Sequence, residues 1–258
     1  MGQGEFSTEI TTSEGRVRGF VARGIAQWRG IPYAQPPVGP LRLRAPQPPT
    51  AWEGVRDATR WGDAAVQASG RTPLGPVKGQ GTSEDCLTLN VSAPASTPTE
   101  PGPTGRRPVM VFIHGGAYLM GTSATAMYSG TSLVRRGDVV HVSLNYRLGA
   151  LGYLDFREFS TPDRTFDSNL GLRDQVAALQ WVQRNIAAFG GDPDNVTIFG
   201  ESAGGNAVTT LTTVPATKGL FHKAISQSSA PGMVATSDRS EKWGRDFVEL
   251  LGATPDTA

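Results

Sequence analysis

The chain has 258 residues, of which 38% are apolar, and this is enough to bury the core of one large domain. Twenty-four basic and 23 acidic residues leave a net charge of +1 without long basic runs, which argues against a nucleic-acid or anionic-membrane partner. No segment reaches the roughly 18 apolar residues of a membrane span, and neither a signal-peptide pattern nor a second cysteine beside Cys86 occurs, so we expect a cytoplasmic protein without internal disulfides.

The first strand that we predict has one buried face, because Leu87, Leu89 and Val91 alternate with polar neighbours. The stretch 93–108 follows and is rich in Pro, Thr and Gly. Such a composition predicts a solvated loop, which here joins two strands and does not mark a domain boundary. The apolar run 109–113 then predicts a strand that is buried on both faces.

Strands and helices alternate along the rest of the chain. Apolar runs at 139–144 and 196–199 predict two further buried strands, and apolar residues at steps of three and four within 172–189 predict a helix between them. We expect another helix at 203–213 and another strand at 224–228. This order implies an α/β fold with a mostly parallel sheet flanked by helices, whose ligands bind at the carboxyl ends of the strands.

A G-x-S-x-G element, Gly200-Glu201-Ser202-Ala203-Gly204, lies between a predicted strand and a predicted helix. In that setting the serine occupies a sharp turn that lifts its hydroxyl above the sheet, and bulky residues cannot stand two places before or after it. The helix N-terminus also favours the negative charge that develops there. We therefore predict Ser202 as a catalytic nucleophile; the alternative is a glycine-rich turn with an incidental serine.

A second motif with a chemical role, His114-Gly115-Gly116-Ala117, follows the strand at 109–113. Acyl transfer places negative charge on a carbonyl oxygen, and backbone N–H groups aimed at that oxygen stabilise the transition state. Small residues suit such a loop because the backbone itself must approach the substrate. We expect the N–H groups of Gly116, Ala117 and Ala203 to form this oxyanion hole. His114 is open to two interpretations, a general base or, as we favour, a positioning residue.

Several segments together resemble the type-B carboxylesterases, the family that includes the cholinesterases. Residues 191–205 are similar to the family's active-serine signature and residues 83–90 to its second signature. The matches run in the family's order from about Gly15 to Pro231, and the other segments that carry them are 30–34, the HGGA loop, 145–149 and 171–175. The resemblance implies the α/β-hydrolase fold and a serine hydrolase that cleaves small-molecule carboxylic esters through an acyl-enzyme, without cofactor or metal.

The resemblance also assigns supporting roles. It implies that Glu201 is the acidic neighbour of the nucleophile and that Ser228 is a second polar residue at the site; a surface carboxylate and a strand-end hydroxyl are the alternatives. Secreted relatives usually pair the signature cysteine with an earlier one, but Ala65 stands where that partner is expected. Cys86 is therefore expected to be a free and mostly buried thiol.

The family's acidic triad member and histidine have no counterpart among residues 1–258, so we expect this chain to be the amino-terminal part of a single hydrolase domain, incomplete at its C-terminus. His141 falls inside a predicted strand, and His222 precedes one and so marks its amino end. Neither suits a general base, which we expect after Ala258, and residues 1–258 alone are expected to be inactive. A non-catalytic binding or adhesion protein on the same fold is the alternative function. Amide or carbamate substrates and the oligomeric state stay open.

Overall fold

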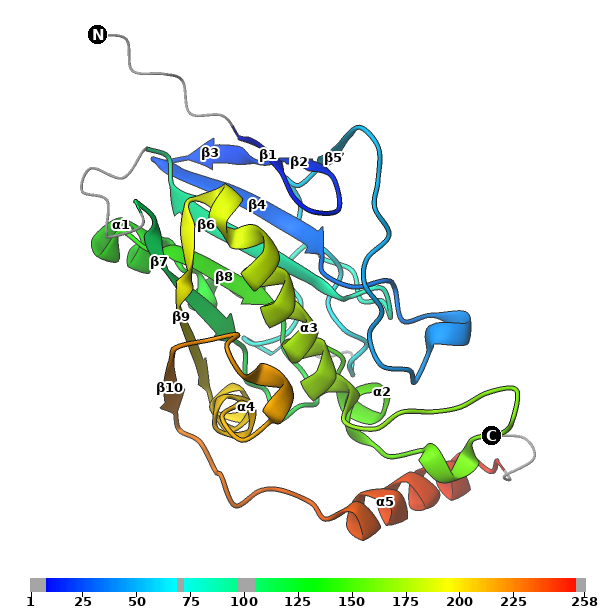
Figure 1. Cartoon of the computed structure of the whole chain (residues 1–258). Coiled ribbons are helices and arrows are strands. Elements are labelled where there is room, and N and C mark those ends of the chain that lie inside the picture. The colour runs from blue at the N-terminus through cyan, green and yellow to red at the C-terminus, as the bar shows by residue number, and fades with distance from the viewer. Residues whose placement is uncertain (1–7, 69–71, 97–104, 254–258) are drawn as a thin grey trace, which may run out of the picture.

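The computed structural model describes residues 8–68, 72–96 and 105–253, and its centre is a seven-stranded sheet (Figure 1). In spatial order the strands are β10 (Lys223–Gln227), β9 (Gly191–Glu201), β7 (Arg107–Ile113), β8 (Val140–Leu144), β6 (Thr88–Pro94), β4 (Ile25–Pro32) and β3 (Phe20–Ala22). The pairings from β10 to β8 are parallel, and those from β8 to β3 are antiparallel. The expected α/β class is confirmed, with the parallel strands gathered in one half of the sheet.

Five α-helices accompany the sheet in the described residues: α1 (Thr131–Gly137), α2 (Gly149–Tyr153), α3 (Leu170–Asn185), α4 (Ala203–Leu211) and α5 (Ser237–Leu250). α3 crosses the front of the sheet in Figure 1, and α4 follows β9 directly. The helix predicted within 172–189 is α3 with the short 3-10 helix η4 (Ile186–Phe189), after which Gly190 turns the chain with φ 81°. Trp181 and Val182 of α3 are fully buried, which explains the apolar spacing seen in the sequence.

The strands in the middle of the sheet are the most deeply buried. All five residues of β8 are buried, as expected from an apolar run between two layers. The expectation for β6 was wrong in one respect, because its polar residues Thr88 and Asn90 are buried as well. The amide of Asn90 donates to the hydroxyl oxygens of Ser123 at 2.9 Å and Ser143 at 3.2 Å. The alternation in β6 therefore reflects an internal polar network and not a solvent-facing side.

The sheet ends at β10, where all five residues are exposed. This strand begins and ends one residue earlier than predicted, and it pairs with β9 in a register that places Gln227 opposite Glu201. The loop predicted at 93–108 does join two strands of the same sheet, β6 and β7, which both pair with β8. Its residues 97–104 lie outside the described part of the chain.

The strands β3 and β4 and the helices α1 and α2 had no counterpart in the sequence-based prediction, and two further parts of the structure were missed as well. One is a small sheet of three strands, β1 (Glu9–Thr11), β2 (Arg16–Arg18) and β5 (Val55–Asp57). The other is α5, drawn in red at the bottom of Figure 1, which buries Val248 in a small cluster with Phe156 and Phe166. The remaining 3-10 helices are η1 (Gly39–Leu41), η2 (Ala126–Tyr128), η3 (Arg157–Phe159) and η5 (Pro215–Thr217).

Candidate active site

The turn that carries Ser202 joins the carboxyl end of β9 to the N-terminus of α4. Ser202 has φ 57° and ψ −121°, a backbone conformation that residues with a side chain rarely adopt. Such strain costs on the order of 1–3 kcal/mol and persists only where neighbouring contacts hold it. One such contact is the N–H of Ser202, which donates to the carbonyl oxygen of Gln227 at 2.9 Å. Parallel pairing of β9 with β10 thus helps to hold the turn in its strained conformation.

The glycines on either side of Ser202 are required by close packing. A β-carbon at Gly200 would lie 2.7 Å from the carbonyl oxygen of Ile113, the last residue of β7, and one at Gly204 would overlap the same oxygen. Gly205 leaves a similar space for the carbonyl oxygen of Gln227. The first turn of α4 therefore lies directly on β7 and β10. This confirms the reason for which the sequence motif requires glycine at these places.

The loop after β7 touches the Ser202 turn. A β-carbon at Gly115 would lie 2.6 Å from the carbonyl oxygen of Glu201 and 3.2 Å from the Cβ of Ser202. Gly116 follows with φ 112°, and a side chain there would overlap the carbonyl oxygen of Met120. The predicted nucleophile and the predicted oxyanion loop are thus adjacent in space, although they lie far apart in the sequence.

Three backbone N–H groups at this junction have no acceptor among the described residues: those of Gly116, Ala117 and Ala203. Ala203 opens α4, where the first N–H groups of a helix lack an intrahelical partner. The helix dipole adds partial positive charge at the same point. Unpaired donors beside an exposed loop form a site for a negatively charged oxygen. The geometry therefore supports all three predicted donors.

His114 lies behind the oxyanion loop and not in it. It is 1% exposed, and its ring stacks on Tyr146 with 4.4 Å between centroids. Burial lowers the pKa of His114 to about 4, so the imidazole is neutral near pH 7. Its Nδ1 lies 2.8 Å from the carbonyl oxygen of Gly115, an acceptor, which fixes the proton on Nδ1. These contacts favour the positioning role over that of a general base.

The two residues with predicted supporting roles lie at the same edge of the sheet. Glu201 ends β9, and its Oε2 would lie 3.2 Å from a β-carbon at Gly115, so this carboxylate lies beside the loop after β7. Burial first, and then the charge of Glu201, raise the pKa of Tyr128. Ser228 directly follows β10 and has φ 51°. Because Gln227 pairs with Glu201, the register brings Ser228 beside the Ser202 turn. Both positions are compatible with the predicted roles.

The remaining histidines lie elsewhere. His141 is buried within β8, as expected, and its ring contacts Phe199 edge-on at 6.0 Å. His222 lies at the amino end of β10, where its Nδ1 accepts from the N–H of Val196 at 3.2 Å. From Val196 to Ser202 the chain runs along β9 for roughly 20 Å, at about 3.3 Å per residue. The structure thus agrees with excluding both residues as general bases.

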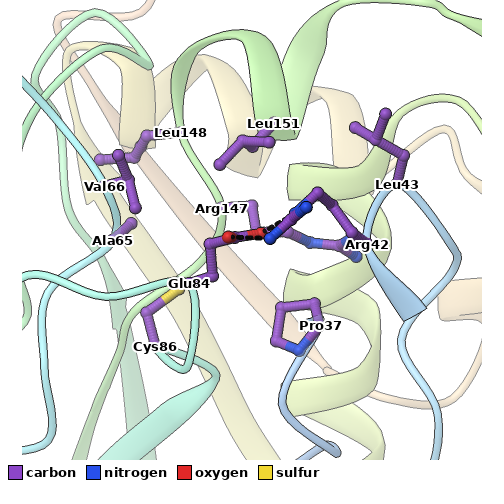
Figure 2. Close-up of a pocket in the computed structure, with 10 residues that line it drawn as sticks. All are labelled: Pro37, Arg42, Leu43, Ala65, Val66, Glu84, Cys86, Arg147, Leu148 and Leu151. Atoms are coloured by element: carbon purple, nitrogen blue, oxygen red, sulfur yellow. Dashed lines mark hydrogen bonds and ion pairs between the residues drawn. The ribbon is translucent and has the colours of Figure 1, made fainter. Parts of the chain in front are cut away.

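Cys86 lies in a separate pocket that Figure 2 shows in close-up. The thiol is 1% exposed, and burial raises its pKa well above the usual value. Ala65 lines the same pocket, which agrees with the expectation of a free, buried thiol. Arg42 and Glu84 close the pocket with two hydrogen bonds of 2.6 Å. Its volume of about 10 Å³ is near that of one water molecule, which excludes a substrate.

The sequence-based prediction missed the side chains that support the oxyanion loop. Gln67 accepts from the N–H of Gly121 and donates to its carbonyl oxygen, both at 3.0 Å. Asn206 of α4 accepts from the hydroxyl of Tyr118 at 2.6 Å. Neither residue belongs to a motif, so the sequence carries no signal for them. Among the described residues, no cluster of acidic, histidine or cysteine side chains could hold a metal ion, and no helix has the length and apolarity of a membrane span.

Comparison with known proteins gives one consistent result. The family model described as "Carboxylesterase family" matches residues 7–258. The chain is 46% identical over 243 residues to the para-nitrobenzyl esterase of Bacillus subtilis, covering 94% of this chain and 48% of that protein. A solved PNB esterase structure aligns with a TM-score of 0.88 at 45% identity, over 97% of this chain and 50% of that one. The Geobacillus stearothermophilus carboxylesterase EST55 aligns with a TM-score of 0.85 at 40% identity, over 96% of this chain and 50% of that one. The chain thus spans about half the length of these relatives.

Proposed function

The chain belongs to the carboxylesterase family, and we propose that the whole protein hydrolyses carboxylic esters of small molecules through an acyl-enzyme on Ser202. One observation carries the proposal. The strained turn of Ser202 touches a loop in which the N–H groups of Gly116 and Ala117 have no acceptor among the described residues. Strain and unpaired donors cost stability, and they persist together where a reaction uses them. A binding protein on the same fold needs neither feature.

The chemistry follows from the atoms at the junction. The Ser202 oxygen attacks the ester carbonyl carbon while its proton passes to a general base, and the carbonyl oxygen becomes negatively charged. The N–H groups of Gly116, Ala117 and Ala203 donate to that oxygen, and each is worth about 2.7–4 kcal/mol in the transition state. Collapse of the intermediate releases the alcohol with the returned proton. Water then repeats the sequence and frees the acid.

The general base has to come from outside residues 1–258. The sequence holds three histidines, and the structure buries two of them and places the third at the far end of β9. A base within hydrogen-bond reach of the nucleophile is needed, with a pKa near the working pH. We propose that a histidine beyond Ala258, with its acidic partner, fills this role. Glu201 and Ser228 then serve as polar supports at the sheet edge.

Covalent labelling of the full-length protein tests the proposal. A fluorophosphonate should attach to Ser202, because the turn presents its hydroxyl beside the oxyanion donors, and peptide mapping by mass spectrometry identifies the labelled residue. Ser202→Ala should abolish both the label and hydrolysis of p-nitrophenyl acetate. Ser228 offers an internal control, since it is an exposed serine at the same edge of the sheet. Label on Ser228 with Ser202 free would refute the assignment.

A second arm of the test addresses the oxyanion loop. Gly116→Val should lower turnover by about 10²–10³-fold, because a side chain there displaces the loop and its N–H donors. We also expect a loss of stability, since the new side chain would overlap the carbonyl oxygen of Met120. Full activity of Gly116→Val would place the oxyanion hole elsewhere.

A further inference from the structure

Asn206 connects three segments that meet at the candidate active site. It lies in α4, one turn after Ser202, and its backbone N–H donates to the carbonyl oxygen of Ser202 at 2.9 Å. Its side-chain Oδ1 accepts from the hydroxyl of Tyr118 at 2.6 Å, and its Nδ2 donates to the carbonyl oxygen of Ala230 at 2.8 Å. Tyr118 belongs to the oxyanion loop, and Ala230 lies two residues after Ser228. One side chain thus joins the loop after β7, the helix that carries the nucleophile and the loop after β10.

The chemistry of the partners fixes the orientation of this amide. The carbonyl oxygen of Ala230 can only accept, so the Asn206 nitrogen must face it and the Asn206 oxygen must face Tyr118. The Tyr118 hydroxyl is then the donor. Burial raises the pKa of Tyr118 to about 12, so the phenol keeps its proton at neutral pH. Both hydrogen bonds are satisfied in only one arrangement of the site.

The oxyanion loop needs support of this kind. Ala117 and Tyr118 have φ values of 56° and 61°, a left-handed conformation that residues other than glycine seldom adopt. The carbonyl oxygen of Tyr118 accepts from the N–H of Gly149 at 2.7 Å, and its ring contacts Tyr153 with 4.4 Å between centroids. Those contacts hold the loop to α2. The hydrogen bond to Asn206 holds it to the helix of the nucleophile.

We propose that Asn206 is a positioning residue, which keeps the N–H groups of the oxyanion loop aimed at the carbonyl that Ser202 attacks. This inference rests on the proposed ester hydrolysis and adds a residue to its machinery. The side-chain hydrogen bonds of Asn206 go to Tyr118 and Ala230 and not to the hydroxyl of Ser202, and the residue is 7% exposed. Its effect passes through Tyr118 to the loop. Because the oxyanion exists only in the transition state, loss of this support lowers kcat and leaves KM nearly unchanged.

The side chain of Asn206 makes two hydrogen bonds, one arm to Tyr118 in the oxyanion loop and one arm to Ala230, and variants can remove these arms separately. Asn206→Leu removes both arms at similar volume, and Tyr118→Phe removes only the arm to the loop. Each should lower kcat for p-nitrophenyl acetate by on the order of 10–100-fold, because small displacements of catalytic groups have effects of that size. Asn206→Asp keeps an acceptor for Tyr118 and loses the arm to Ala230. It should recover most of kcat if the Tyr118 arm carries the effect.

The double variant Asn206→Leu with Tyr118→Phe tests whether the two residues act together. Residues that act through one contact are not additive, so the double variant should lose no more kcat than Asn206→Leu alone. Asn185 is a matched control: it is also buried on a helix, at 3% exposure, and its Oδ1 accepts from the N–H of Ser13 at 2.7 Å, away from the site. Asn185→Leu should lower stability and leave kcat unchanged.

Hydrogen exchange gives a measurement that does not depend on hydrolysis. In the full-length protein, the hydrogen-bonded amides of the segment 119–121 should exchange at least about tenfold faster in Asn206→Leu than in the wild type or in Asn185→Leu. Unchanged exchange in this segment, unchanged kcat, or an increase in KM alone would each overturn the inference. A wild-type protein that neither hydrolyses esters nor labels on Ser202, but shows the exchange difference, would overturn the proposed function while Asn206 keeps its role in holding the loop.

Discussion

Two residues that follow parallel strands on either side of β7 differ in how their polar groups are satisfied. Ser202 follows β9 in a strained conformation, and its hydroxyl has no hydrogen-bond partner among the described residues. Arg147 comes shortly after β8 and is fully engaged: its N–H, Nε and Nη2 donate to Asp174 at 3.0, 2.8 and 2.7 Å, and its Nη1 donates to the carbonyl oxygen of Arg44 at 2.8 Å. One edge of the sheet thus carries a predicted nucleophile whose hydroxyl has no partner among the described residues and a guanidinium in which each nitrogen donates a hydrogen bond.

The contrast indicates which residues should affect turnover and which should affect stability. Strained, unsatisfied groups lower stability and are kept for chemistry, whereas buried charges persist only when their hydrogen bonds are complete. Changes in the Ser202 turn should therefore act on turnover, and changes around Arg147 should act on folding. Variants at the two places should separate these two kinds of effect.

The largest effect is expected from Ser202→Gly. Turnover of the full-length protein should fall on the order of 10⁶-fold, because loss of the nucleophile costs about as much as loss of a whole triad. Glycine also relieves the strain at φ 57°, so this variant should be more stable than Ser202→Ala by about 1 kcal/mol, as measured by urea unfolding. A less stable Ser202→Gly would mean that the turn stores no strain.

Asp174→Asn should produce the opposite pattern. Asp174 is completely buried, and the variant leaves the guanidinium of Arg147 without a counter-charge. The free energy of unfolding should fall by about 3–5 kcal/mol. The kcat of the remaining folded protein should change far less than in the Ser202 variants. Replacing both residues by apolar ones of similar size is the control, and it should be less harmful than Asp174→Asn alone.

Acid should lower the stability of the fold around Arg147 through His141, which lies in β8, the strand that leads toward Arg147. Burial lowers the pKa of His141 to about 4 from an ordinary value near 6.5, so the unfolded chain binds the proton more readily. This contribution to stability is complete above about pH 6.5, and up to about 3 kcal/mol is lost as the pH falls toward 4. Unfolding measured at several pH values should show a smaller slope for His141→Leu. Comparison at pH 8 isolates the packing loss.

Gln67 donates to Ala65, which lines a pocket together with Arg147, and it also binds Gly121 of the oxyanion loop. Its removal should give the smallest effect. Gln67→Ala leaves the backbone of Gly121 unpaired, which should cost about 1–2 kcal/mol of stability and lower kcat by about tenfold as the loop shifts. Gln47 is the matched control: both glutamines donate at 3.0 Å to the carbonyl two residues earlier, but only Gln67 reaches the oxyanion loop. Equal kcat values for the two variants would contradict this support.

The sequence alone was sufficient to predict the two motifs of the candidate site, because each motif is local. The strand, the turn of Ser202 and the helix occupy one continuous stretch, and glycines on both sides of the serine satisfy contacts that the motif implies. The same holds for the loop after β7. The short strands β1, β2 and β5 escaped prediction, since three residues are too few for a period to show.

The fold class could be predicted from the sequence, and its motifs predict Ser202 and the donors around it, because hydrophobic period and turn chemistry act between near neighbours. The side chains that hold these motifs together became visible only in the folded structure. Asn206 reaches Tyr118, and Gln67 reaches Gly121, across long separations in the chain. Such contacts depend on how strands and helices pack, so no local pattern announces them. The polar residues of β6 illustrate the same limit, because alternation reports polarity but not whether solvent or a buried partner satisfies it.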